Sequence, residues 1–565
     1  MSPSLPRRTF AALALAPLGA VILPGAALAE PSDFDASNLD DTGFEGTAAP
    51  NPAPVPDLTG CGVNPATPKR EFRAMWIASV VNIDWPRTTG LDEQTLKADY
   101  RAWLDLAERL NHNAVVVQIR PTADAFWPSP YEPWSEWLTG KRDGVGPGWD
   151  PLAWMVAETH SRNLEFHAWF NPYRVSMPAP GGAAGDISKL APNHPVRQHP
   201  DWAVPYPVGN AATRLYYNPG IPEVREFVQT AIMDAVLNYD IDGVHFDDYF
   251  YPYPASGQDF GDAATFTQYG AGFATKADWR RNNIDLLIQE MSEKVRTAKP
   301  WVKFGVSPFG IWRNKAADPL GSDTAGTQSY DANFADTRKW VKQGWLDYIV
   351  PQVYWSIGFA VADYGKLVPW WADVVAGTQC QLYIGQADYK ISLAGQPAAW
   401  FDPNEMGKHI ALNRSLPEVD GSIHFSAKDV KANRLGATDL VLAQYYSRPS
   451  LVPALERVAA RPMLPPVITH LGSETGGVRV SWLAPAESAE PLGEPTSFAV
   501  YRFDGRDPLP DNCDLADAGQ LIGTVRGTSF LDTTAQPHTA YTYVVTGLDR
   551  VWHESAPSMG RFTTA

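Results

Sequence analysis

The chain is poor in cysteine and lacks the short motifs that mark several common chemistries. Its three cysteines, Cys61, Cys380 and Cys513, are odd in number and widely spaced, which argues against a disulfide framework. The sequence also has no CxxC pair, the spacing that would indicate a zinc site. There is no HExxH, no GxSxG elbow and no P-loop, which disfavours zinc peptidases, serine hydrolases of that class and nucleotide-binding enzymes. We therefore expect neither a metal nor another cofactor.

Basic residues are also scarce. The chain has 46 Lys and Arg against 63 Asp and Glu, a formal net charge of −17. A nucleic-acid-binding protein needs clustered Lys and Arg to displace counterions from phosphates, and no such cluster is present. We exclude nucleic acid as a partner and expect a neutral or weakly charged one. The 21 Trp and 22 Tyr suit either large cores or a sugar site, because aromatic rings offer rigid apolar area with a polar tip.

Long apolar runs are absent except at the N-terminus, where one covers residues 10–28. Arg7 and Arg8 precede it and the small-residue pattern ALA follows at 27–29, so residues 1–29 predict an export signal peptide. The string PRRTFAALALA resembles a twin-arginine signal; ordinary secretion and a tethering remnant are the alternatives. We expect an exported protein (extracellular, periplasmic or cell-wall associated) with no transmembrane segment.

The remaining sequence divides into three parts. Residues 30–68 are rich in Asp, Pro, Ala and Gly without periodicity, as in a flexible linker. Residues 69–460 alternate apolar runs with amphipathic helical segments. Residues 464–565 contain short alternating strands between Gly, Asp and Pro turns, which predicts an immunoglobulin-like β-sandwich. The spacing of its Trp and Tyr residues resembles a fibronectin type III module, for which we expect a spacer or docking role.

Eight apolar runs in the middle part predict parallel strands: 72–80, 114–119, 165–170, 242–247, 303–308, 347–355, 381–386 and 421–426. Runs that are apolar throughout are typical of strands buried on both faces. Eight of them alternating with helices predict an α/β fold, the (β/α)8 TIM barrel. An open doubly wound sheet is the alternative, but no GxGxxG follows the first strand.

In such a barrel the active site lies at the C-terminal ends of the strands. The richest strand end is IDGVHFDDYFYP at 241–252, where two adjacent acids, Asp247 and Asp248, are followed by aromatic residues. Because side chains alternate along a strand, His245, Asp247 and Tyr249 share one face. Two buried acids repel each other, so one pKa is expected to rise into a range useful for proton transfer. A structural role, as a loop cap or an arginine partner, is the alternative for each acid.

Glycoside hydrolysis usually needs two carboxyl groups across the scissile bond. We predict Asp247 as the first catalytic acid, and Asp248, Asp388 or Asp124 as the second. For Asp388 a helix cap is the structural alternative. Substrate-binding roles, through hydrogen bonds to the sugar or stacking on it, are predicted for Trp85, Arg120, Asn171, Tyr173, His245, Tyr249, Gln352, Tyr354 and Trp355. The alternative to a metal-free site is an ion held by His167, His245 and Asp247.

Six segments, in order over about residues 70–390, resemble the glycosyl hydrolase-like family ten (the DUF187 group) of bacterial exported proteins: EFRAMWIASVVNIDWP, AVVVQIRPTADAFWPSPYEPWSEWLTG, EFHAWFNPYR, GVHFDDYFYP, FGVSPFGIWRN and DYIVPQVYW. The resemblance implies a TIM barrel that acts on bacterial cell-wall glycan or a related polysaccharide.

The fourth-strand segment is also similar to the family eighteen chitinase pattern DGxDxDxE. Asp242 and Asp247 match its first and inner Asp, and Tyr354 lies where that family keeps a tyrosine. His245 replaces the middle Asp, however, and Tyr249 replaces the general-acid Glu. Since tyrosine is a poor acid at neutral pH, a chitinase-type mechanism is disfavoured.

The sequence therefore predicts an exported glycoside hydrolase with a polysaccharide partner, above all peptidoglycan glycan strands, and with Asp247 as an essential carboxylate. Two alternatives stay open. One is a non-catalytic cell-wall glycan-binding protein, and the other is a hydrolase of a different polysaccharide. The oligomeric state is not predicted.

Overall fold

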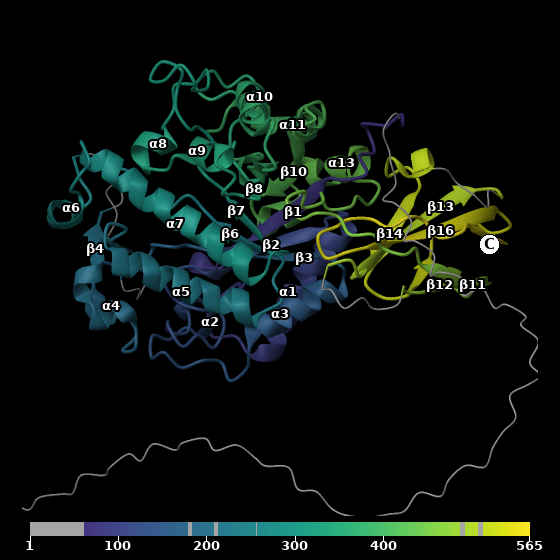
Figure 1. The fold of residues 1–565 in the computed structure, drawn as a ribbon, viewed down its shortest axis with the longest axis horizontal. Helices are drawn as coiled ribbons and strands as arrows, with labels where there is room; N and C mark the ends of the chain where they lie inside the picture. The colour runs from purple at the N-terminus through teal and green to yellow at the C-terminus, as the bar shows by residue number, and fades with distance from the viewer. Residues whose placement is uncertain (1–60, 179–183, 208–212, 256, 486–491, 507–511) are drawn as a thin grey trace, which may run out of the picture. The chain divides into compact units, whose positions relative to one another are not determined.

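The computed structural model describes residues 61–178, 184–207, 213–255, 257–485, 492–506 and 512–565 (Figure 1). Eight parallel strands close into a barrel in the order β1-β10-β9-β8-β7-β6-β3-β2. They are β1 (Phe72–Ile77), β2 (Ala114–Arg120), β3 (Glu165–Phe170), β6 (Gly243–Phe246), β7 (Lys303–Val306), β8 (Tyr348–Ile349), β9 (Gln381–Gln386) and β10 (Val419–His424). Each lies in or overlaps a predicted run, so the predicted α/β TIM barrel is confirmed.

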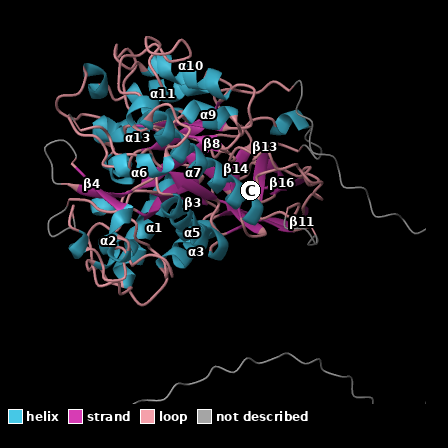
Figure 2. Ribbon diagram, turned by 60° about the vertical axis from the view of Figure 1, so that its left-hand side comes forward, coloured by secondary structure: helices cyan, strands magenta, loops and turns pink. Residues whose placement is uncertain are grey.

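Burial explains why these runs are apolar. Every residue of β1, β2 and β3 is buried, because one face meets the packed barrel interior and the other meets the helices. Figure 2 shows the strands lying inside a layer of helices. β8 is shorter than its predicted run 347–355, since Pro351 has no N–H to continue the ladder.

The helices are set by ordinary capping and spacing. α1 (Glu93–Arg109) begins where Asp92 accepts a hydrogen bond from the Thr95 amide at 3.0 Å, and it buries Leu96, Tyr100 and Leu104 toward the barrel. The other α-helices are α2 (Glu136–Thr139), α3 (Pro151–Ser161), α4 (Pro195–Gln198), α5 (Pro222–Asn238), α6 (Ala263–Tyr269), α7 (Lys276–Ala298), α8 (Ser329–Ala332), α9 (Thr337–Lys342), α10 (Tyr364–Val375), α11 (Glu405–Arg414), α12 (Ala427–Ala432) and α13 (Ala437–Gln444).

Short elements decorate the loops. A two-stranded hairpin of β4 (Ala203–Tyr206) and β5 (Arg214–Tyr217) is inserted between β3 and α5. Short 3-10 turns cover η1 (Val80–Asn82), η2 (Ile187–Lys189), η3 (Pro200–Trp202), η4 (Asp388–Lys390), η5 (Ala398–Phe401), η6 (Arg434–Gly436) and η7 (Asn512–Leu515). None of the helices in the described part of the chain has the length and apolar character needed to cross a bilayer.

The C-terminal part is all β, as predicted. One sheet has the order β11-β12-β15 and the other β14-β13-β16-β17. The strands are β11 (Val467–Glu474), β12 (Gly477–Leu483), β13 (Ser497–Asp504), β14 (Leu521–Val525), β15 (Ser529–Asp532), β16 (Ala540–Leu548) and β17 (Arg561–Thr564). Trp482, Phe498 and Tyr543 belong to a core of their own between the sheets. We call residues 467–564 the C-terminal β-module.

This module packs against the N-terminal ends of the barrel strands. One hydrophobic cluster joins Phe72 and Tyr348 of the barrel with Tyr501, Leu548 and Trp552 of the module. A spacer on a free linker would share no such core with its neighbour. The module therefore closes the end of the barrel that lies opposite the strand C-termini.

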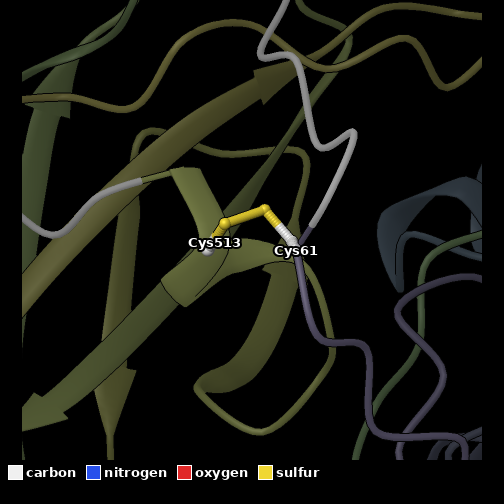
Figure 3. Close-up of a disulfide and its surroundings, with 2 residues drawn as sticks. All are labelled: Cys61 and Cys513. Atoms are coloured by element: carbon white, nitrogen blue, oxygen red, sulfur yellow. A yellow bond between two sulfur atoms is a disulfide. The ribbon is translucent and has the colours of Figure 1, made fainter.

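A disulfide joins Cys61 to Cys513 of the module (Figure 3). The expectation that the cysteines form no disulfide was wrong. The two residues are 452 positions apart, and spacing cannot reveal a pair that only the docked module brings together. Cys61 lies in the predicted linker, and just after the linker Lys69 pairs with Glu554 at 2.7 Å, so this part of the chain is fastened to the module.

Candidate active site

A cavity of about 390 Å³ lies at the C-terminal ends of the strands. Its size is in the range of small-molecule and cofactor sites. Aromatic, apolar, acidic and basic side chains share its wall. We call it the mouth pocket; its lining residues are Trp76, Val80, Val81, Ile83, Trp169, Arg174, Met177, Arg214, Asp247, Asp248, Tyr249, Ser307, Gln352, Tyr354, Tyr389 and Phe425.

Asp247 follows the last residue of β6 and is held from three sides. The Asn171 side-chain amide donates to its Oδ2, the Trp169 indole donates to the same oxygen at 3.3 Å, and the Tyr249 amide donates to Oδ1 at 3.3 Å. Burial raises the pKa of Asp247, and the charge of Arg174 together with these hydrogen bonds opposes that rise. The carboxylate is thus fixed in orientation at the pocket wall.

Asp248 lines the same pocket although it is the next residue in the chain. Strand alternation no longer separates the two acids, because β6 ends at Phe246. Burial, and then the negative charge of Asp247, raise the pKa of Asp248 to about 7. The Tyr253 hydroxyl donates to its Oδ2. Near neutral pH this carboxyl group can hold and release a proton, which is what a general acid must do.

Asn171, a predicted substrate-binding residue, is instead buried beside Asp247. Its Oδ1 accepts from Gln118 at 2.5 Å and from Arg174 at 2.8 Å, which turns its amide group toward Asp247. Arg174 also lies over the Tyr249 ring, 5.0 Å from its centroid. These contacts orient the acid and leave Asn171 no exposed surface for a sugar.

Five predicted site residues are brought together in the mouth pocket. Asp247, Asp248, Tyr249, Gln352 and Tyr354 all line it. The Gln352 side-chain amide donates to the Ser307 carbonyl, just after β7, at 2.9 Å. Gln352 also interacts with Asp248 and favours the charged form of that carboxyl group. Burial raises the pKa of Tyr354 well above its usual value, so its hydroxyl stays protonated and can donate.

His245 lies beneath the pocket floor. It is fully buried and accepts from the Trp76 indole at 3.1 Å, with the Ser307 hydroxyl 3.0 Å away. Nδ1 of His245 and Nδ1 of His167 both contact the Tyr348 hydroxyl. Within the described ranges, no group of three His, Cys, Asp or Glu side chains is arranged to hold a metal ion.

The two other candidate acids lie elsewhere. Asp388 accepts from Nδ1 of His424 at 3.0 Å and borders a separate, smaller void. Asp124 accepts from the Thr122 amide at 2.9 Å within its own loop. Neither lines the mouth pocket, so the structure brings Asp248, and not these residues, beside Asp247.

Four more predicted residues lie outside the pocket wall. Arg120 is buried in an ion pair with Glu132, with its Nε 2.6 Å from Oε2. Tyr173 is wholly buried. The Trp85 indole donates to the Leu96 carbonyl of α1, and the Trp355 ring packs against Phe309. Strand-end position alone does not show whether a side chain faces the pocket or the helix layer.

Several pocket residues were not predicted. Trp76 lies within β1, and Arg214 comes from the β4–β5 hairpin. Tyr253, which follows the aromatic residues after β6, contacts Asp248 but is not one of the residues that line the pocket. Tyr389 and Phe425 lie just beyond β9 and β10. The last two were within reach of the strand-end rule, but nothing in the sequence shows that the hairpin folds over the mouth.

Comparison with known proteins gives a consistent result. The family model described as Glycosyl hydrolase-like 10 matches residues 71–402. Glycosyl hydrolase YngK of Bacillus subtilis (strain 168) is 47% identical over 495 residues, covering 86% of this chain and 92% of that protein. Glycosyl hydrolase DigH of Escherichia coli (strain K12) is 42% identical over 382 residues, covering 64% of this chain and 84% of that protein.

Among solved structures, the PgaB (BpsB) glycoside hydrolase domain from Bordetella bronchiseptica has a TM-score of 0.42 at 13% identity, covering 67% of this chain and 99% of that one. The endo-beta-1,4-mannanase from Thermotoga petrophila has a TM-score of 0.38 at 10% identity, covering 87% and 97%. The family match spans more than half of the chain, and the named relatives are glycosyl hydrolases. The chain belongs to the Glycosyl hydrolase-like 10 family, and this membership supports a glycosidase.

Proposed function

We propose that the protein is an exported glycoside hydrolase that cleaves bacterial cell-wall glycan strands in the mouth pocket. The observation that carries the proposal is the pair of buried acids at the end of β6. Asp247 and Asp248 line one sugar-sized cavity, and the pKa of Asp248 is raised to about 7 by burial and by the charge of Asp247.

The two acids are suited to different steps. Asp248 in its protonated form donates to the glycosidic oxygen, while Tyr253 holds Oδ2 and leaves Oδ1 for the proton. Asp247 is the ionised partner, and its charge stabilises the positive charge that develops on the sugar ring as the bond breaks. Water then forms the new bond to the anomeric carbon, and its proton returns Asp248 to the protonated form. Asn171 and Trp169 keep it in position.

The pocket wall also supports a cell-wall glycan as the substrate. Tyr389 and Phe425, both half-buried, offer aromatic surface for sugar rings, and the nearly buried Trp76 forms part of the same wall. Arg174 and Arg214 add two guanidinium groups, and the Nε of Arg214 has no hydrogen-bond partner in the described part of the chain. Such groups suit a carboxylate. Muramic acid units carry a free one where the stem peptide has been removed, whereas chitin and neutral glucans carry none.

Export is part of the same proposal. The disulfide Cys61–Cys513 supports it, because disulfides persist in oxidising compartments and are rare in the cytosol. The export signal predicted for residues 1–29 lies outside the described residues. We also propose that the C-terminal β-module is fibronectin type III-like, which its sheets of three and four strands support.

The test is reducing-end release from purified peptidoglycan glycan strands, with chitin and a neutral α-glucan as comparison substrates. We expect release from the glycan strands and a loss of about a thousandfold in Asp247→Asn, with an unchanged melting temperature. Turnover in that variant at the native rate would remove Asp247 from the mechanism. Pull-down of the strands without release would favour the rival, a wall-glycan binding protein.

A further inference from the structure

A line of hydrogen bonds runs along the barrel interior from the mouth pocket to the C-terminal β-module. It starts at the Trp76 indole, which contacts Nε2 of His245 at 3.1 Å. Nδ1 of His245 lies 3.1 Å from the Tyr348 hydroxyl, and the same hydroxyl lies 2.9 Å from Nδ1 of His167. Nε2 of His167 contacts Glu165 at 2.8 Å. These groups come from β1, β6, β8 and β3, and all are buried.

The direction of every bond in this line follows from one end. An indole N–H can only donate, so Nε2 of His245 accepts from Trp76. Burial lowers the pKa of His245 well below its usual value, so the neutral ring carries its proton on Nδ1 and donates to Tyr348. The Tyr348 hydroxyl, which accepts from His245, then donates its single proton to Nδ1 of His167. The neutral His167 ring carries its proton on Nε2 and donates it to Glu165.

The far end is fixed by charge and by the C-terminal β-module. Both oxygens of Glu165 accept from Lys303, at 2.8 and 2.9 Å, and Oε1 also accepts from the Trp552 indole at 2.7 Å. Trp552 reaches this position from a turn between β16 and β17 with φ of +68°. That backbone region is unfavourable for a bulky side chain, so the surrounding contacts must hold it.

The turn that carries Trp552 is docked by further contacts. Arg550 pairs with Asp240 at 2.6 Å, and the Val551 carbonyl accepts from the Leu455 amide at 3.0 Å. The module therefore presents its indole to the base of the barrel as a fixed group. Displacing the Trp552 indole would leave Oε1 of Glu165 with one hydrogen-bond donor fewer in a site that is 4% exposed.

We propose that Tyr348, together with Trp552 of the C-terminal β-module, is a positioning residue for the mouth pocket. The line of hydrogen bonds fixes the tautomer of His245, and that tautomer holds the indole of Trp76 in the wall of the pocket that receives the sugar. The module is then a working part of the glycosidase. This inference rests on the proposed function only in taking the mouth pocket as the sugar site.

The kinetic test uses three single substitutions in the full-length protein. Tyr348→Phe removes only the hydroxyl in the middle of the line, and Trp552→Phe removes the N–H at its end together with part of the buried ring system. Tyr383→Phe is the matched control, because Tyr383 is equally buried beside Tyr348 but bonds to Gln381 outside the line.

We expect Tyr348→Phe to raise KM for glycan strands about tenfold and Trp552→Phe about threefold, with kcat nearly unchanged, the size expected from losing one buried hydrogen bond. In this proposal Trp76, which lines the pocket and donates to His245, acts on sugar binding and not on proton transfer, so KM rises and kcat does not fall. A merely structural role would reduce the active fraction and hence kcat, leaving KM alone. Tyr383→Phe should stay within about twofold in both constants.

The second readout needs no turnover. In protein labelled with ¹⁵N-histidine, His245 should show the neutral tautomer protonated at Nδ1, identified by the signals that vanish in His245→Gln. We expect Tyr348→Phe to give a mixture of tautomers and Tyr383→Phe to leave the spectrum unchanged. If the native protein cleaves no glycan, the proposed function fails while this spectrum still tests the line.

Two results would overturn the inference. One is native His245 protonated at Nε2, since the Trp76 indole would then face another donor. The other is a Tyr348→Phe variant that matches Tyr383→Phe in both KM and spectrum.

Discussion

Two buried carboxylates at the closed end of the barrel, Glu165 and Glu554, differ from the two at the mouth, Asp247 and Asp248. At the closed end, burial by itself raises the pKa of Glu165, but Lys303 and His167 outweigh it, and the pKa lies below its usual value. The pKa of Glu554 is likewise lowered, because the charge of Lys69 helps to outweigh burial. At the mouth, burial raises the pKa of Asp247 and of Asp248, and no cation outweighs it.

This difference distinguishes carboxylates that stabilise the fold from carboxyl groups that can take part in the reaction. A carboxylate with its own cation is ionised at all working pH values and holds the module on the barrel. Where no cation outweighs burial the pKa is raised, and at Asp248 it reaches about 7, so this carboxyl group can exchange its proton near neutrality. Such a group lowers stability and is kept where a reaction needs it. The burial is the same at both ends, so the placement of Lys and Arg decides the role.

The largest expected effect is at the mouth. Asp248→Asn should lower turnover about a thousandfold, because Asn has no proton to give to the leaving oxygen. Since the folded-state pKa of Asp248 is raised from 3.8 to about 7, stability is lost as pH rises through that range. The neutral variant avoids this loss, so its melting temperature at pH 8 should exceed that of the native protein. A lower melting temperature of Asp248→Asn would show that the Asp248 carboxylate stabilises the fold.

The next effect concerns stability at the closed end. Glu165→Gln should cost about 3–5 kcal/mol of unfolding free energy, because it leaves Lys303 buried without a counter-charge. Urea unfolding at pH 7 measures the loss. Asp99→Asn is the control: its pair with Arg87 lies at the surface, with the two side chains 25% and 56% exposed, and should be worth less than about 1 kcal/mol. Equal costs for the two variants would erase the contrast between buried pairs and surface pairs.

A smaller effect follows from the proton on Asp248. Turnover requires the protonated acid, so kcat/KM should fall about tenfold for each pH unit above about 7, the value to which burial and the charge of Asp247 raise the pKa of Asp248. A pH series from 6 to 9 on soluble glycan strands measures it. The residual activity of Asp248→Asn should lack this alkaline limb. A flat native profile would mean that another group supplies the proton.

The fold followed from the sequence because eight apolar runs and their helices repeat a local pattern that only a few architectures satisfy. The acids at the end of β6 and the strand-end residues Gln352 and Tyr354 followed from the same rule. Arg120 and Trp85 did not, because a side chain at a strand end can face the helix layer as well as the mouth. Arg214 and the pair Cys61–Cys513 depend on contacts between distant segments, which no local pattern encodes.

The smallest expected effect is at Asp388, which lies near the mouth but outside the pocket. Asp388→Asn keeps an oxygen for the hydrogen bond from Nδ1 of His424, so kcat/KM should stay within about twofold and stability within about 1 kcal/mol of native. Assays on glycan strands beside Asp248→Asn provide the measurement. A loss of a hundredfold would show that the second acid comes from β9, across the barrel from Asp247. The two catalytic acids would then come from different strands. The absence of a cation that outweighs burial would no longer distinguish the catalytic acids from the other buried carboxylates.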